Sequence, residues 1–298
     1  MVGTRFPDTG VEGGVGLTAL MVAAARAIET HRPDALARDV YAEHFVRAAR
    51  ASAGWPVRPD DVPDGDANPL WGRLARYFGL RTRALDDFLV GCTHAGSTQV
   101  VLLAAGLDAR AYRLDWPAGT VVHELDREGV LAFKHRVLNG IEAVPKAERK
   151  PIATDLREDW ATDLVHAGFD PSAPTTWLVE GVLLYLPPDA ERALFATIDR
   201  LSAPGSAVAY EAKLAREFPD LRDDHLYAST LEQIGVDLLA LFDGEPRPDS
   251  ATDLANRGWS AHVHTPFDFT RHHGRGVHPV GNDPLAGNRW VFASKPLR

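Results

Sequence analysis

Two patterns of apolar residues divide the chain. Up to about residue 90 the apolar positions fall mostly at helical spacing, and helices are expected at 18–28, 34–51 and 70–90. After Gly96, short apolar runs alternate with helix-like stretches. The runs are expected as strands at 99–105, 120–126, 150–155, 175–180 and 206–210, with helices near 127–139, 157–167 and 189–202. Continuous apolar strands that alternate with helices indicate a parallel sheet covered on both faces.

The remaining segments complete the expected architecture. Residues 55–69 contain four prolines and are expected as a loop. Segments 213–242 and 249–257 are expected to be helical, the first with interruptions at Pro219 and Gly235. Two late strands, 260–265 and 289–294, are separated by a loop rich in Gly, Pro and His, and we expect them to form an antiparallel pair at the end of the sheet.

Composition narrows the possible functions. The 298 residues carry a formal net charge of −9, and an acidic surface repels a phosphate backbone, so nucleic-acid and anionic-membrane binding are not expected. The one cysteine, Cys92, excludes an intramolecular disulfide and a multi-cysteine metal site. No apolar run approaches the roughly 20 residues needed to span a bilayer. Residues 1–16 are Gly-rich and slightly acidic, unlike a signal peptide, so a cytoplasmic location is expected.

The strongest chemical signal is the apolar run 99–105, which ends in a turn of small residues at Gly106. Asp126 follows Gly106 by 20 residues and ends the next expected strand. This spacing suits a carboxylate that accepts hydrogen bonds from ribose hydroxyl groups. The alternative is an ordinary strand-to-helix turn with a surface acid.

The turn lacks the second and third glycines of the dinucleotide-binding motif GxGxxG. It carries Asp108 instead, whose charge would repel a pyrophosphate. A nucleoside without phosphate fits better, and S-adenosylmethionine is the obvious candidate.

Several longer motifs carry a family resemblance. They are Arg81-Thr-Arg83 with Asp86-Asp-Phe88, the run from Gln99 to Leu114, Glu124-Leu-Asp126, Asp155-Leu-Arg157 with Trp160, and the run from Trp177 to Leu186. With these motifs the chain, from Thr18 to Ala293, resembles the S-adenosylmethionine-dependent methyltransferases of the leucine carboxyl methyltransferase superfamily, in its bacterial branch.

The resemblance implies a fold and a domain organisation. The expected fold is the α/β class I methyltransferase fold, a Rossmann-like doubly wound sheet with an antiparallel terminal strand. An N-terminal helical cap is expected over 1–95 and the methyltransferase core over 96–298. Within that core, the segment of about 213–257 is expected to form a helical lid.

The resemblance also assigns cofactor contacts, position by position. Ala104 and Gly106 would lie against the methionine part of S-adenosylmethionine, and Ala104 stands where some relatives have glycine. Asp126 would hold the ribose. Asp155 and Leu156 would flank the adenine.

Two more residues are expected at the amino-acid end of the cofactor. Glu180 would lie near its amino group, and Arg81 would pair with its carboxylate, because a guanidinium fork suits a carboxylate. Arg83 is a close rival of Arg81 for this role. Without the resemblance, the alternatives are a strand-end acid paired with an arginine for Glu180 and a surface ion-pair partner for Arg81.

The histidines do not predict a metal site. His262 and His264 alternate on a strand, and three more follow at His272, His273 and His278. Alternating histidines on a strand edge are often solvated, and the sequence supplies no clear third ligand, so no metal is expected.

The resemblance implies formation of a methyl ester on a carboxylate of a small molecule or peptide. A carboxylate is ionised at neutral pH and needs no general base, whereas a hydroxyl or phenol acceptor of secondary metabolism, the alternative within the class, usually needs one. His225 and Tyr227 are weak candidates for acceptor-side residues. The alternatives from other classes are a nicotinamide-dependent oxidoreductase, which the missing glycines oppose, and a module that binds the cofactor without catalysis.

Overall fold

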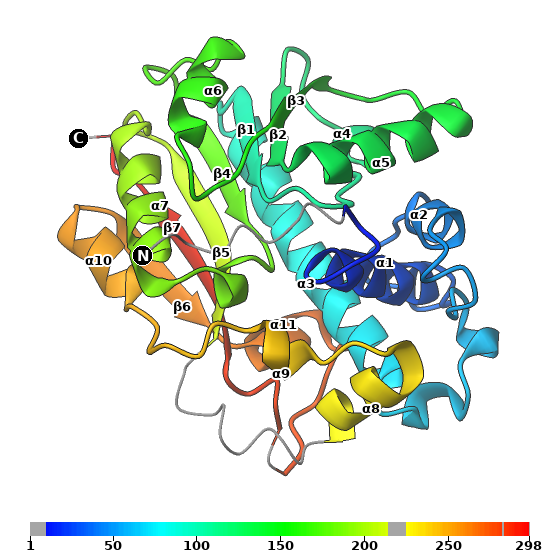
Figure 1. Ribbon diagram of the computed structural model, residues 1–298. Coiled ribbons are helices and arrows are strands. Elements are labelled where there is room, and N and C mark those ends of the chain that lie inside the picture. The colour runs from blue at the N-terminus through cyan, green and yellow to red at the C-terminus, as the bar shows by residue number, and fades with distance from the viewer. Residues whose placement is uncertain (1–9, 214–224, 282, 298) are drawn as a thin grey trace, which may run out of the picture.

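A seven-stranded sheet runs through the centre of the described chain (Figure 1). The computed structural model describes residues 10–213, 225–281 and 283–297. The strands are β1 (Gln99–Leu103), β2 (Val121–Asp126), β3 (Glu148–Ala153), β4 (Thr175–Val179), β5 (Ala207–Lys213), β6 (Ser260–His264) and β7 (Asn288–Ser294). Their order is β3-β2-β1-β4-β5-β7-β6, with β1 to β5 parallel and β7 antiparallel to both β5 and β6. The predicted α/β doubly wound class with an antiparallel terminal pair is confirmed.

Helices connect and cover the strands. They are α1 (Gly16–Thr30), α2 (Ala42–Ala48), α3 (Trp71–His94), α4 (Arg110–Arg113), α5 (Glu128–Gly140), α6 (Trp160–His166), α7 (Pro188–Arg200), α8 (His225–Ile234), α9 (Leu238–Leu241), α10 (Ser250–Asn256) and α11 (Pro266–His273). Short 3₁₀ turns are η1 (Pro59–Asp61), η2 (Gly65–Ala67) and η3 (Leu183–Tyr185). Within the described ranges, no helix has both the length and the apolar character needed to cross a membrane.

Two hydrophobic cores lie on the two faces of the sheet. Val100 and Leu102 of β1 belong to the core that contains residues of α1, α3 and α5. Val101 and Leu103 belong to the core formed with α6, α7 and α10. Figure 1 shows these two helical layers on opposite sides of the sheet. Because neighbouring residues of β1 are buried in different cores, its sequence is apolar at four consecutive positions.

The long helix α3 joins the N-terminal region to the sheet. It packs along α1 and also contacts β4 and β5. The division at residue 95 stays a prediction, although α3 itself forms part of the layer that covers the sheet. The segment expected to form the lid, 213–257, contributes to two different parts of the structure. Its helix α10 packs against α7 and β6, whereas residues of α8 and α9 line the cavity described below.

Two expected elements differ from the structure. Of the helix expected at 34–51, α2 alone forms, because Asp39 is held in a turn by its backbone N–H to Thr30 Oγ1 (2.7 Å) and by an ion pair with Arg26 Nε (3.1 Å). The loop expected before the last strand contains α11. A capping box between Thr265 and Asp268, with proline at the first helical position, starts this helix. The expected helix at 213–242 lies partly outside the described residues, and α8 and α9 follow.

His123 is a fully buried histidine in the middle of β2. Neither ring nitrogen has a hydrogen-bond partner among the described residues, and the ring meets Phe169 edge-on at 5.8 Å between centroids. Burial lowers the pKa of His123 from 6.5 to about 4, with a smaller contribution from Lys150. The imidazole is therefore neutral in the folded protein at pH values where the unfolded chain protonates it.

We expect the His123 imidazole to make the folded protein less stable as the pH falls from about 6.5 toward 4. Over this range the unfolded state binds the extra proton, which lowers the free energy of unfolding by up to about 2 kcal/mol at pH 5. Thermal unfolding of wild type and His123→Leu at pH 7 and pH 5 tests this. The fall in Tm between the two pH values should be several degrees smaller in the variant, and an equal fall would contradict the prediction.

Candidate active site

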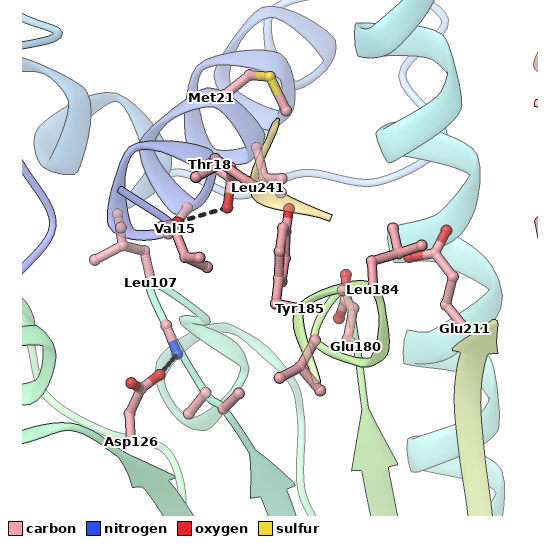
Figure 2. A pocket seen from close by; sticks show the side chains of 18 of the residues that line it. Val15, Thr18, Met21, Leu107, Asp126, Glu180, Leu184, Tyr185, Glu211 and Leu241 are labelled. Carbon is pink, nitrogen blue, oxygen red and sulfur yellow. Dashed lines mark hydrogen bonds between the residues drawn. The ribbon is translucent and has the colours of Figure 1, made fainter. Parts of the chain in front are cut away.

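A cavity of about 560 Å³ lies at the carboxyl ends of the parallel strands (Figure 2). The strand order places β1 between β2 and β4, so the connections after β1 and β4 diverge here. Open α/β sheets bind ligands at this crevice, and the volume is typical of a small-molecule site. The described wall residues come from 13–26, 74–81, 102–108, 126–130, 154–157, 178–186, 211–213, 226–242 and 285–288.

The turn after β1 forms the floor of the cavity. Ala104 and Gly106 both have left-handed backbone conformations, with φ of 53° and 49°. The turn is held by Ala105 N–H, which donates to Leu125 O (2.9 Å), and by Asp108 N–H, which donates to Ala105 O (2.9 Å). Because Ala104 has a Cβ, it adopts with strain a conformation that glycine adopts freely.

Asp126 closes the same turn from the end of β2. Its Oδ2 accepts a hydrogen bond from Gly106 N–H (2.6 Å), and its Oδ1 accepts one from Arg127 N–H (2.7 Å). Burial raises the pKa of Asp126, while these two backbone donors act to lower it. The predicted Asp155 and Leu156 line the cavity next to it, after β3. The structure therefore brings Gly106 and Asp126, predicted from their spacing, together with Asp155 and Leu156, which the resemblance had implied.

Glu180 follows β4 and lies between two arginines. Its Oε1 is 2.9 Å from Arg81 Nη2, and its Oε2 is 2.6 Å from Arg110 Nη1. Burial acts to raise the pKa of Glu180, but the Arg110 and Arg81 charges prevail and hold it at about 2. Glu180 is therefore a carboxylate at every physiological pH.

Arg110 is a residue whose role the sequence analysis missed. Its side chain is fully buried and also bonds Asp86 Oδ1 through Nε (2.7 Å), and Asp108. It thereby fixes Glu180 relative to α3 and the turn after β1. The only sequence signal was its place in the motif Gly106-Leu-Asp-Ala-Arg110, which does not reveal these partners.

The structure distinguishes the two candidate arginines of α3. Arg81 is 4% exposed and lines the cavity. Arg83 is exposed and pairs with Asp87 on the same helix (2.8 Å). The Arg81 guanidinium lies over the Phe78 ring at 4.5 Å, and its Nε has no hydrogen-bond partner among the described residues. Arg81, and not Arg83, is therefore placed to meet a ligand.

Glu211 near the end of β5 is a second missed residue. One of its oxygens pairs with Arg81 Nη1 (2.5 Å), and the other accepts a hydrogen bond from Tyr77 Oη. Asn288 Nδ2 also donates to Tyr77 Oη (2.7 Å). Burial and the Glu211 charge raise the pKa of Tyr77 well above 10. In the sequence, the position of Glu211 directly after the strand expected at 206–210 was the feature that could have indicated a site residue.

The two candidate acceptor-side residues, His225 and Tyr227, differ in their position relative to the cavity. Tyr227 of α8 lines the cavity, and its Oη accepts a hydrogen bond from Lys213 Nζ (2.8 Å). His225 is exposed and is not among the described residues of the cavity wall, so the structure gives no support to its candidacy. Tyr185 of η3 also enters the cavity, where its side chain extends toward Leu241 of α9 (Figure 2). Burial raises the pKa of this phenol above 10.

The histidines of the C-terminal region lie elsewhere. His264 of β6 packs against Phe269 and Phe292, with ring centroids 5.5 and 5.9 Å away. Within the described ranges, no group of three or more His, Cys, Asp or Glu side chains is arranged to bind a metal ion.

The chain is similar to known proteins over most of its length. A family model described as leucine carboxyl methyltransferase matches residues 19–199. A Streptomyces coelicolor protein with the provisional name S-adenosyl-L-methionine-dependent methyltransferase is 68% identical over 99% of this chain and 97% of its own length. A Rhodococcus jostii protein of the same provisional name is 45% identical over 90% of each chain.

Solved structures share the fold at low sequence identity. A Thermobifida fusca structure described provisionally as a methyltransferase has a TM-score of 0.53 and 15% identity, covering 99% of this chain and 100% of its own. A Streptomyces avermitilis protein of the duf574 family has a TM-score of 0.51 and 13% identity, covering 92% of this chain and 97% of its own. Both similarities support the architecture of the sheet and its helices.

The left-handed conformations of Ala104 and Gly106 predict opposite effects of substitution on the free energy of unfolding. Ala104→Gly should leave the free energy of unfolding unchanged or raise it by up to about 1 kcal/mol, because relief of left-handed strain exceeds the added chain entropy. Gly106→Val should lower it by roughly 1–2 kcal/mol, because a β-branched residue tolerates positive φ poorly. Denaturant unfolding measures both, and destabilisation by Ala104→Gly would contradict the assigned backbone conformation.

Proposed function

Because the chain belongs to the leucine carboxyl methyltransferase family, we propose that it transfers a methyl group from S-adenosylmethionine to a carboxylate of a small molecule or peptide. S-adenosylmethionine supplies an activated methyl group on a sulfonium. An ionised acceptor oxygen forms the new bond to the methyl carbon as the carbon–sulfur bond breaks, and the electron pair remains on sulfur. The products are a methyl ester and S-adenosylhomocysteine, and no proton moves.

The nucleoside end of the cavity fits this cofactor. Asp126 lies where ribose hydroxyl groups can donate to its carboxylate, and Asp155 with Leu156 supplies a wall for the adenine. Glu180 adds an ionised carboxylate to the wall, which suits the ammonium group of the cofactor. This arrangement supports S-adenosylmethionine over a nicotinamide dinucleotide.

The amino-acid end of the cofactor would meet Glu180 and Arg81. Glu180 is ionised and can accept hydrogen bonds from the ammonium group. Arg81 has five N–H donors, and its ion pairs with Glu180 and Glu211 leave a donor on each terminal nitrogen for the cofactor carboxylate. The two acids therefore position Arg81 before any ligand arrives.

The observation that supports a carboxylate acceptor is that the described part of the cavity wall offers no evident general base. None of the described cavity-wall residues is a histidine, and the phenols of Tyr77 and Tyr185 have raised pKa values. A phenol or alcohol acceptor would have to lose a proton before or during transfer, whereas a carboxylate arrives ionised.

We expect Asp126→Asn to weaken binding of S-adenosylhomocysteine about ten- to a hundredfold. The ribose hydroxyls would lose a charged acceptor, which costs roughly 1.5–3 kcal/mol. The amide oxygen can still accept from Gly106 N–H, but the amide NH2 cannot accept from Arg127 N–H, so thermal unfolding of the variant is measured alongside. Calorimetry measures the dissociation constant. Glu128→Gln, which removes an exposed acid two residues away at the start of α5, is the matched control and should bind like wild type. Equal affinities for all three proteins would make Asp126 a structural acid.

The product should be a methyl ester that releases methanol in mild alkali. Incubation with methyl-labelled S-adenosylmethionine and a panel of carboxylic acids, phenols and short peptides, followed by base treatment, tests this. Volatile label from acids or peptide termini supports carboxyl transfer, because methyl ethers survive alkali. Base-stable label on a phenol would instead establish hydroxyl methylation and require a base outside the groups considered above.

A further inference from the structure

Arg127, the first residue after β2, lines the part of the cavity that the proposed function assigns to the nucleoside. Its backbone is fixed on both sides of the side chain. The N–H donates to Asp126 Oδ1 (2.7 Å), and the carbonyl oxygen accepts from Val130 N–H (3.0 Å) and Leu131 N–H (3.1 Å) in the first turn of α5. The side chain therefore starts from a rigid point at the carboxyl end of the sheet.

The guanidinium group of Arg127 is half-buried and is not committed to another part of the protein. Among the residues that the structure describes, none forms an ion pair or a hydrogen bond with it. Arg157 in the same wall differs, because its Nε lies 2.9 Å and its Nη2 2.5 Å from the two carboxylate oxygens of Asp155. Arg127 therefore keeps its N–H donors and its planar face available to a ligand.

The charge of Arg127 acts on both acids in this part of the cavity. Burial raises the pKa of Asp126, and the Arg127 charge is among the groups that act to lower it. The pKa of Asp155 is lowered mainly by its hydrogen bond with Arg157, and the Arg127 charge contributes. Because the interaction of two charges declines with distance, the guanidinium lies near both carboxylates. It is thus placed at the same subsite as Leu156, where the adenine is expected.

A guanidinium group has the right chemistry for the face of a purine base. It is planar, delocalised and weakly hydrated, and it stacks on aromatic rings, whose π-electrons attract the positive charge. Stacking on a base needs no fixed pattern of hydrogen bonds. A half-buried guanidinium can cover an adenine while its edge keeps contact with water, so the contact costs little desolvation.

We propose that Arg127 binds the cofactor by stacking its guanidinium group on the adenine ring. The inference rests on the proposed function, because it assigns this part of the cavity to adenosine. Arg127 recognises the base, whereas Asp126 recognises the ribose, and Glu180 with Arg81 recognises the amino-acid end. The cofactor is therefore held by three separate sets of contacts, and the contribution of each can be measured with a ligand that lacks the matching part.

The experiment compares ligands with and without the base. Calorimetry is carried out with S-adenosylhomocysteine and with 5′-methylthioadenosine, which lacks the amino acid. Arg127→Ala should weaken the binding of both by the same factor, about three- to thirtyfold, the effect of a cation–π or stacking contact. S-ribosylhomocysteine has the ribose and the amino acid but no base. In competition experiments it should bind wild type and Arg127→Ala with equal affinity.

Matched variants separate stacking from charge and from general damage. Arg127→Tyr keeps a flat stacking surface without the charge and should recover most of the affinity for S-adenosylhomocysteine. Arg127→Lys keeps the charge without the plane and should bind like Arg127→Ala. Arg136→Ala is the control, because it removes an exposed arginine of α5 that lies over the Phe133 ring outside the described cavity wall, and it should bind like wild type. If Arg127→Ala does not fold, the comparison of the tyrosine and lysine variants still decides.

The outcomes distinguish this inference from the proposed function. Failure of wild type to bind S-adenosylhomocysteine contradicts the proposed function. Normal binding by wild type with unchanged affinity in Arg127→Ala, or with full affinity in Arg127→Lys, overturns the stacking contact and leaves the proposed function standing. An equal loss of affinity for S-ribosylhomocysteine also overturns it, because the loss would not depend on the base. Wild type that binds adenosine 2′-monophosphate more tightly than 5′-methylthioadenosine, with the difference lost in Arg127→Tyr, would assign Arg127 to a phosphate instead.

Discussion

The buried guanidinium of Arg110 is the interaction on which the site depends. It joins Asp86 of α3, Asp108 after β1 and Glu180 after β4, three segments that are far apart in the sequence. A buried charge is tolerated when its partners are in place, and loss of one partner typically costs about 3–5 kcal/mol. The network extends from Glu180 through Arg81 to Glu211, so one alternating series of charges runs from the first strand turn to β5.

The cavity wall along this series carries both signs of charge. Its acids Asp126, Asp155, Glu180 and Glu211 each lie beside an arginine. Under the proposed function, a cationic sulfonium and an anionic carboxylate meet in this cavity and become a neutral thioether and a neutral ester. A reaction that annihilates charge is favoured by a low dielectric constant, so the apolar residues of the wall assist it.

The sequence predicted those features that depend on local pattern. Buried parallel strands read as apolar runs, and the 20-residue spacing from Gly106 to Asp126 located two neighbouring strand ends. The role of Arg110 could not be predicted in the same way, because its three carboxylate partners become neighbours only in the folded chain. The position of Lys213 in the cavity wall was not predicted, because the strand expected at 206–210 extends to residue 213. The sequence analysis had assigned Lys213 to the lid segment instead. Helix α11 was not predicted, because the Gly, Pro and His content of the segment before the last strand indicated a loop. The capping box between Thr265 and Asp268 nevertheless starts a helix there.

The position of β7 has a consequence for how the site is assembled during synthesis. β7 is made after every other strand of the described sheet, yet it lies between β5 and β6 and pairs with both. It contributes Trp290 and Asn288, which donate to the Tyr77 hydroxyl from 3.3 and 2.7 Å. Until β7 emerges from the ribosome, β5 lacks this neighbour and its Glu211 and Lys213 wall lacks support. The part of the cavity wall at the ends of β1 and β2 can therefore form while the chain is still being translated, whereas the part at β5 is completed after translation of β7.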